Sequence, residues 1–196
     1  EKEILKYLKK HKLPARDPKQ NLYDLKAQLA ANQKGIIELD RIIKNYGVVN
    51  VKKYVQFIQQ NCSKIIHKVI NKISFCSNTL KMDNGAIIKV SMKYNDLIKK
   101  LVVDFSGTSG QLKNSFNAPT AVTKSVIIYF LRTLIKNNIP LNEGFLKDIK
   151  IIIPDKSMLN PEYPAPVVAG NVETSQTLID CLNTALKIQA TCYGTM

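Results

Sequence analysis

The spacing of hydrophobic residues changes partway along the chain, and this change restricts the fold more than any other feature. From about residue 19 to residue 45, apolar side chains recur three and four positions apart, with Asn32 at the one expected apolar place. The apolar residues are Leu22, Leu25, Leu29, Ile36, Leu39 and Ile43. This spacing predicts one long amphipathic helix, and Gly47 is its expected stop.

A second stripe with the same spacing follows, and it predicts a helix from about residue 51 to Ile73. Its apolar residues are Val51, Val55, Ile58, Cys62, Ile65 and Val69. Asn50 is the expected N-cap, because asparagine is among the preferred residues at that position. The two helices, joined by residues 46–50, predict an antiparallel helical hairpin within residues 1–75.

Short β-type runs replace the helical spacing in the next part of the chain. Asp83-Asn84-Gly85 and Tyr94-Asn95-Asp96 are turn signals, and they separate runs at 79–82, 86–92 and 98–105 that predict an antiparallel meander. Further on, the patterns predict a helix at 119–137, a buried strand at 149–153 and a helix at 175–187. The expected fold class is therefore α+β: a helical hairpin at 1–75, then a meander and further helices packed on a mixed sheet at 76–196. We expect these two segments to form one incomplete domain.

Composition excludes several classes of protein. With 196 residues and 45% hydrophobic residues, the chain can bury a core, but no apolar run approaches the length of a membrane span. Residues 1–12 interleave charges with apolar residues, which a secretory signal does not do. The four cysteines, at 62, 76, 181 and 192, form no closely spaced pair and are interpreted as reduced thiols of a cytoplasmic protein.

The net charge of +14 comes mainly from lysine. Only Arg16, Arg41 and Arg132 are arginine, the side chain that favours bidentate recognition of bases and phosphates. We therefore favour a solvated lysine-rich surface over nucleic-acid recognition, and expect any nucleic-acid binding to be weak and independent of sequence.

Common cofactor and metal motifs are missing from the sequence. There is no phosphate-binding loop of the Walker or dinucleotide type, so we expect this chain not to bind ATP by itself. His11 and His67 are the only histidines, and neither has a metal-ligand partner one helical turn away. Cys62 and His67 are expected to be a core thiol and a solvated imidazole.

Polar residues gather in two segments, each expected to follow a β-type run and to lead into a helix. The first, residues 104–111 with Asn114 and Asn117 after it, carries glycines that let backbone amides turn toward a bound anion or carbonyl. The second is residues 170–176. The candidate site residues are Asp104, Thr108, Ser109, Gln111 and Asn117 in the first segment, and Asn171, Glu173, Thr174 and Gln176 in the second. Ordinary helix capping is the alternative explanation for both.

Several stretches resemble the hydantoinase B family, the B-type half of ATP-dependent 5-oxoprolinases and N-methylhydantoinases, in order and spacing. They are residues 16–32, Asp104-Phe-Ser-Gly-Thr-Ser-Gly-Gln111, Phe116-Asn-Ala-Pro119, Ile139-Pro-Leu-Asn-Glu-Gly144, Leu159-Asn-Pro161, Val168-Ala-Gly-Asn-Val-Glu-Thr-Ser-Gln176 and Gly194-Thr-Met196. The family's B-type half is much longer, and its metal-binding segment lies outside the matched stretches. The resemblance thus implies an internal piece of such a subunit.

The resemblance also implies an activity. In the family, the A-type subunit phosphorylates the carbonyl of a cyclic amide such as 5-oxoproline or a hydantoin, and the B-type half completes the hydrolysis. ATP and a divalent metal are expected in the complete enzyme, and none of them is expected on this chain. Asp104 or Glu173 would be the catalytic carboxylate that moves a proton or holds a metal, and the other candidate residues would orient the ring.

The resemblance leads to one structural expectation and leaves one alternative function open. If the two polar segments form one site, they should lie close together in the fold, because ligand sites gather at strand-to-helix junctions. The rival reading is a non-catalytic remnant or interaction module that keeps the fold and binds a partner subunit, or polyanions through its lysines.

Overall fold

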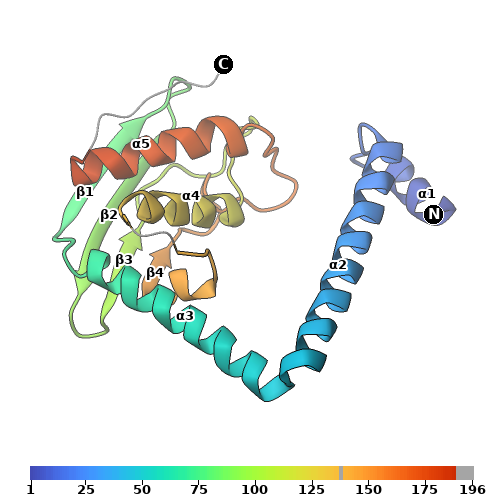
Figure 1. The fold of residues 1–196 in the computed structure, drawn as a ribbon. Helices are drawn as coiled ribbons and strands as arrows, with labels where there is room; N and C mark the ends of the chain where they lie inside the picture. Colours follow the sequence, from blue (N-terminus) through green and yellow to red (C-terminus); the bar gives the residue numbers. More distant parts are fainter. Residues whose placement is uncertain (137–138, 189–196) are drawn as a thin grey trace. The chain divides into compact units, whose positions relative to one another are not determined.

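The computed structural model describes residues 1–136 and 139–188 (Figure 1). The final residue of the predicted helix at 119–137, Cys192 and the Gly194-Thr-Met196 stretch lie outside the described residues. The chain divides into two compact units, Glu1–Gln56 and Phe57–Met196. Helices come first, then strands, then further helices, so the predicted α+β class is confirmed.

The long predicted helix is present as α2 (Pro18–Tyr46). Asp17 caps it, because its side chain accepts hydrogen bonds from the backbone N–H groups of Lys19 and Gln20. The helix ends at Gly47, whose φ of 78° suits glycine and few other residues. A shorter helix that sequence reasoning did not predict, α1 (Lys2–Lys10), contacts α2.

The second predicted helix is α3 (Val48–Ile70), and it begins earlier and ends earlier than expected. Asn50 is not its N-cap: the residue lies inside the helix, and its side-chain amide donates to the carbonyl of Tyr46. Cys62, Ile66 and Ile70 are buried in the core of the second unit. The helix is therefore confirmed, whereas its predicted capping residue is wrong, and of its predicted apolar stripe only Cys62 is fully buried.

One mixed sheet lies at the centre of the second unit. Its strands are β1 (Cys76–Lys81), β2 (Ile87–Asn95), β3 (Lys100–Asp104) and β4 (Ile149–Ile152), in that spatial order. The first three form the predicted antiparallel meander. The fourth pairs with β3 in parallel, which requires the chain to cross over the sheet between them. Helix α4 (Thr120–Thr133) lies in this crossover.

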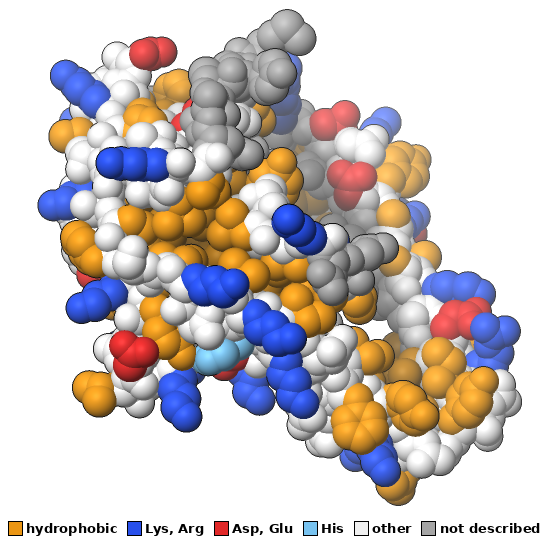
Figure 2. Space-filling view, turned by 60° about the vertical axis from the view of Figure 1, so that its left-hand side comes forward, with side chains coloured by type: hydrophobic (Ala, Val, Ile, Leu, Met, Phe, Trp, Pro, Cys, Tyr) orange, Lys and Arg blue, Asp and Glu red, His pale blue; other side chains and the backbone are white. Residues whose placement is uncertain are grey.

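Helices cover one face of the sheet. α5 (Ser175–Leu186) packs on β1 and β2 and against α4. Residues of β2 alternate accordingly, because successive side chains point to opposite faces: Ile88, Val90 and Met92 are fully buried, while Lys89 and Lys93 are exposed. In Figure 2, lysines and arginines are spread over the visible face among hydrophobic and neutral side chains. Within residues 1–136 and 139–188, no helix combines the length and apolar character that crossing a bilayer requires.

Candidate functional site

The first polar segment continues the sheet beyond the end of β3. Thr108 Oγ1 accepts from the backbone N–H of Lys89 and donates to the Lys89 carbonyl, both at 3.1 Å. Ser109 accepts from the N–H of Ile87 through its hydroxyl at 2.8 Å and donates its own N–H to the Ile87 carbonyl. These contacts satisfy backbone groups of β2 that β3 does not reach. Both hydroxyls are therefore engaged with the scaffold.

The other first-segment candidates also make local contacts. Asp104 Oδ1 accepts from the N–H of Ser106 at 2.8 Å, which closes a turn after β3. Gln111 Oε1 accepts from the N–H of Glu162 at 2.6 Å, and the Gln111 N–H donates to the Lys156 carbonyl. The segment is thereby tied to β2 on one side and to residues 156–162 on the other.

Asn117 is fully buried and is the most heavily bonded candidate. Its Oδ1 accepts from the N–H of Leu112 at 2.8 Å. Its Nδ2 lies within 3.0 Å of the carbonyl oxygens of Leu112, Asn114 and Pro166. The side chain joins the approach to α4 with the approach to the second polar segment.

The second polar segment forms one π-helical turn, Gly170–Thr174, that runs directly into α5. The predicted helix at 175–187 is confirmed, but the expected strand before this segment is wrong, because residues 153–169 contain no named strand. Gly170 lies against the Asn117 carbonyl, where a Cβ would clash with the backbone. Thr174 is fully buried and donates its hydroxyl to the carbonyl of Phe116 at 2.5 Å. Residues 115–118 therefore clamp the turn in place.

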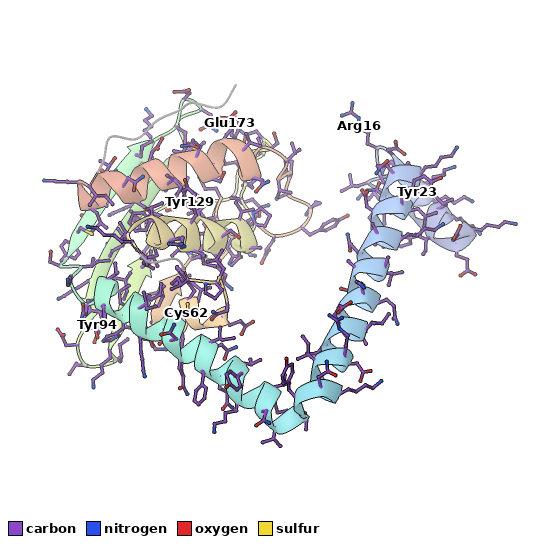
Figure 3. All side chains as sticks on the ribbon, viewed as in Figure 1. Arg16, Tyr23, Cys62, Tyr94, Tyr129 and Glu173 are labelled. Atoms are coloured by element: carbon purple, nitrogen blue, oxygen red, sulfur yellow. The ribbon has the colours of Figure 1, made fainter. Side chains whose placement is uncertain are left out.

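Above this clamp, the turn lines a pocket of about 340 Å³ between α4 and α5. Asn171, Ser175 and Gln176 supply polar groups from the turn and α5, and Ser125 and Tyr129 supply hydroxyls from α4. The apolar lining consists of Val122, Val126 and Ile179. Figure 3 shows Tyr129 on α4, next to α5.

The two serine hydroxyls in this pocket are engaged by their own helices. Ser175 Oγ donates to the carbonyls of Asn171 and Val172, and Ser125 Oγ donates to that of Ala121. The side-chain amides of Asn171 and Gln176 and the hydroxyl of Tyr129 are therefore the groups best placed to bond a ligand. An amide offers both a donor and an acceptor, which matches the two halves of another amide.

A second pocket, of about 390 Å³, lies beside the same turn, and Glu173 is one of its lining residues. Thr177 and Asp180 continue this face along α5, and Phe116 and the β1–β2 turn, residues 80–84, complete the lining. Asp180 Oδ1 is buried without a hydrogen-bond partner. Glu173 lies at the N-terminal end of α5 (Figure 3). Three carboxylates, those of Asp83, Glu173 and Asp180, thus line one pocket together with Lys81.

The structure divides the candidates of the second segment: Asn171 and Gln176 line the first pocket, Glu173 lines the second, and Thr174 is buried and bonded to the Phe116 carbonyl. Neither pocket has a lining residue from 104–111. The contact between the segments runs through Asn117, which bonds at 112–114 and at Pro166. The prediction that one pocket draws on both segments is therefore not met by these two pockets.

The described thiols are not suited to nucleophilic catalysis. Burial raises the pKa of Cys181 to about 11, and burial also raises the pKa of Cys62 and of Cys76. A thiol with a raised pKa stays protonated at neutral pH, and the thiolate is the nucleophile. All three are free cysteines, as predicted for Cys62 in the core. His67 is less solvated than predicted, because it is half-buried with Nε2 3.3 Å from the Tyr94 hydroxyl.

The divalent metal that the resemblance leads us to expect in a complete enzyme does not fit the described residues. Within them, no three His, Cys, Asp or Glu side chains group in a way that could hold a metal ion. No reaction step is therefore assigned to a metal on this part of the chain.

Sequence reasoning missed Ser125, Tyr129 and Asp180. Asp180 stands seven positions after Glu173, which is the spacing of one helix face, so helical periodicity could have indicated it. Ser125 and Tyr129 stand four apart on α4 and carry no distinguishing signal, because their importance depends on which helix packs beside them.

The fold and the site thus define a class of protein: an α+β unit with a mixed sheet, in which the polar residues at the start of α5 are held in place by residues 115–118. The chain matches the Hydantoinase B/oxoprolinase family over residues 1–196 and belongs to that family. It is 39% identical over 180 residues to 5-oxoprolinase of Saccharomyces cerevisiae, covering 89% of this chain and 14% of that protein. It is 38% identical over 192 residues to 5-oxoprolinase of Dictyostelium discoideum, covering 93% of this chain and 15% of that protein.

The fold is similar to that of a solved enzyme, the ATP-dependent caprolactamase of Pseudomonas jessenii. The TM-score is 0.73 at 21% sequence identity, over 88% of this chain and 31% of that one. The family and the fold are therefore both known, and the chain spans about one-seventh of the length of the 5-oxoprolinases it matches.

Proposed function

We propose that this chain is the part of a hydantoinase B type subunit that holds a small cyclic amide, 5-oxoproline or a hydantoin, while the activated ring is hydrolysed. An A-type partner subunit would activate the ring carbonyl with ATP in the cytoplasm. ATP and the divalent metal belong to other parts of the complete enzyme in this proposal. Family membership and the 36–39% identity to 5-oxoprolinases support it.

The α4–α5 pocket is the observation that carries the proposal. Its volume of about 340 Å³ is at the low end of the range for ligand pockets, which suits a single small ring. Val122, Val126 and Ile179 offer an apolar surface for the ring carbons. The amides of Asn171 and Gln176 would bond the N–H and C=O of the ring.

Glu173 is the preferred proton-transfer group. Its carboxylate lines the adjacent pocket on the same turn, whereas an oxygen of Asp104 is already bonded to the Ser106 N–H. In the proposed step, water attacks the phosphorylated ring carbon while Glu173 takes a proton from it, and the ring C–N bond breaks as its nitrogen gains a proton. A second water then releases phosphate from the resulting acyl phosphate and leaves the carboxylate. Asp104 is the second candidate for the role of Glu173.

Kinetics of a complete subunit that contains this segment, assayed with its A-type partner, test the proposal. Glu173→Gln should lower kcat by at least about 100-fold with little change in KM, because general acid–base groups contribute on the order of 10²–10⁴ in rate. Gln176→Ala should raise KM about 5- to 10-fold, which corresponds to one lost hydrogen bond of roughly 1 kcal/mol. Gln60→Ala, at an exposed position of α3, is the matched control. Unchanged kinetics in Glu173→Gln and Gln176→Ala would overturn the proposal.

The alternative is a non-catalytic interaction module. The first polar segment favours it, because Thr108, Ser109 and Asn117 all spend their hydrogen bonds on the scaffold. The same assay separates the two functions, since a non-catalytic module would leave the chemical step insensitive to Glu173.

A further inference from the structure

The hydroxyl of Tyr129 lines the α4–α5 pocket, and the proposed function gives it no role in the reaction. The pocket has two other hydroxyls, those of Ser125 and Ser175, and both donate to carbonyls of their own helices. The Tyr129 side chain is 61% exposed, and within residues 1–136 and 139–188 its hydroxyl has no hydrogen-bond partner. Tyr129 therefore brings to the pocket a hydroxyl proton that the scaffold does not use.

The position of Tyr129 on α4 directs its ring along the pocket. The α4 residues that line the pocket stand three or four positions apart on one helix face: Val122, Ser125, Val126 and Tyr129. A helical side chain leans toward the N-terminus of its helix, so the Tyr129 ring extends over its neighbours on this face. Asn171 and Gln176, the amides that bond the substrate ring in the proposed function, line the same pocket from the turn and α5. A ring held by these amides therefore shares the pocket with the Tyr129 hydroxyl.

The proposed ring opening needs two proton transfers. Glu173 takes a proton from the attacking water, and the ring nitrogen must gain one as its bond to carbon breaks, because an amine anion is a very poor leaving group. Glu173 lines the other pocket. Within the α4–α5 pocket, the amides of Asn171 and Gln176 hold their protons at neutral pH, whereas a tyrosine hydroxyl is among the groups that act as general acids. Tyr129 is thus the pocket residue suited to protonate the nitrogen.

We propose that Tyr129 is the general acid of this ring opening, an inference that rests on the proposed function. As the C–N bond of the water adduct breaks, its electron pair passes to the nitrogen, and the nitrogen takes the proton of the Tyr129 hydroxyl. This step yields the acyl phosphate, a neutral nitrogen group and the Tyr129 phenolate. Because the side chain is exposed, solvent can return a proton to the phenolate, and Glu173 releases its own proton to solvent. Both residues then end the cycle as they began it.

The basicity of the leaving nitrogen determines how much this proton matters. Opening 5-oxoproline frees an amine, whose nitrogen does not leave without a proton. Opening a hydantoin at the nitrogen between its two carbonyls frees a urea nitrogen, whose negative charge the second carbonyl can share. Loss of a general acid should therefore slow the opening of 5-oxoproline more than that of hydantoin. Loss of a structural or binding contact should affect the two substrates alike.

Kinetics with both substrates test the proposal in a complete subunit that contains this segment, assayed with its A-type partner and ATP. Tyr129→Phe should lower kcat about 100-fold with 5-oxoproline and less than about 10-fold with hydantoin, with KM changed less than about threefold. Tyr163→Phe is the matched control: it makes the same change at a 76% exposed position that lines neither pocket, and it should leave both rates unchanged. Circular dichroism establishes that each variant stays folded.

Equal losses of kcat with the two substrates, or a rise in KM alone, would overturn the role of Tyr129 as an acid. So would a Tyr129→Phe subunit that opens 5-oxoproline at the wild-type rate while Glu173→Gln is slow. That second result would leave the proposed function standing and assign both proton transfers to Glu173. If Glu173→Gln, Gln176→Ala and Tyr129→Phe all match the wild type, the proposed function and this inference fail together.

Discussion

The two polar segments of the second unit have similar compositions and different structures. Residues 104–111 run beside β2 and close its unpaired backbone groups with Thr108 and Ser109. Residues 170–176 form a turn held from below by Thr174 and leave Asn171 and Gln176 lining a pocket. Both segments contain glycine, hydroxyls, an amide and a carboxylate. They differ in their hydrogen-bond partners: the hydroxyls of the first segment bond backbone groups of β2, whereas Asn171 and Gln176 of the second line a pocket.

This comparison separates support from recognition. A hydroxyl or amide that completes the scaffold's own hydrogen bonds is costly to redirect to a ligand, because the backbone group it leaves would be unsatisfied. Side chains without such duties can bond a substrate at little cost. Asn117 and Thr174 belong to the first kind, and Asn171 and Gln176 to the second.

The largest expected effect is at Gly170. Gly170→Ala places a Cβ against the Asn117 carbonyl, so the clamp must open, and we expect a loss of about 4 kcal/mol in the free energy of unfolding. Gly110→Ala in the first segment is the control, because its nearest neighbour would be the Lys156 oxygen at 3.9 Å, an ordinary contact. Urea unfolding measures both variants. Equal losses would remove the distinction between a clamped and an unclamped segment.

Asn117→Ala should cost about 3 kcal/mol or more, because it leaves several buried backbone groups unpaired at once. Asn114→Ala is the control, since Asn114 is exposed and its side chain accepts one bond, from the Phe116 N–H at 3.3 Å. Urea unfolding should separate the two variants clearly. A cost for Asn117→Ala no larger than that of the control would mean that Asn117 does not join the segments.

The pH dependence of a Cys181 variant tests whether α5 is buried. The second polar segment leads directly into this helix. The pKa of Cys181 rises from 9.0 to about 11 on burial, so the folded chain holds the thiol proton more tightly than the unfolded chain does. The resulting stability is complete below pH 9 and is lost as the pH rises to about 11. The stability gap between wild type and Cys181→Ala should therefore narrow by roughly 2 kcal/mol between pH 8 and pH 11. A gap that is constant with pH would contradict the buried position.

The smallest expected effect compares two threonines. Thr174→Val removes the hydrogen bond from a fully buried hydroxyl to the Phe116 carbonyl and should cost about 1–2 kcal/mol. Thr108→Val, at a half-buried position where water can replace the hydroxyl, should cost less than about 1 kcal/mol. Thermal unfolding of both variants checks the order. A larger loss of stability in Thr108→Val than in Thr174→Val would show that the first segment contributes more to the stability of the fold.

Periodicity predicted the elements, because apolar spacing depends on local geometry. The apolar stripe of residues 19–45 predicted helix α2, and the β-type run at 86–92 predicted strand β2; both elements are present. The prediction for Asn50 was wrong, because the helix starts at Val48 and the Asn50 amide bonds the Tyr46 carbonyl instead of capping the helix. Helix α1 and the π-helical turn were missed because neither produces a long periodic signal.

The site was harder to predict than the fold. Residue types marked both polar segments as unusual, but they could not show that the Asn117 side chain bonds only the protein's own backbone or that Asn171 lines a pocket beside α4. Those facts depend on the crossover between β3 and β4, which brings residues 115–118 beneath residues 170–174. Whether the candidate residues act in catalysis stays a prediction.

Amide chemical shifts of the full chain titrated with 5-oxoproline test the central claim most directly. We expect concentration-dependent shifts at Asn171, Ser175 and Gln176, with Thr108, Ser109 and Gln111 unmoved, because the first segment supports the fold and the second lines the pocket. Gln176→Ala should reduce the shifts, and Gln60→Ala should not. Shifts confined to residues 104–111, or none up to millimolar concentrations, would contradict the account.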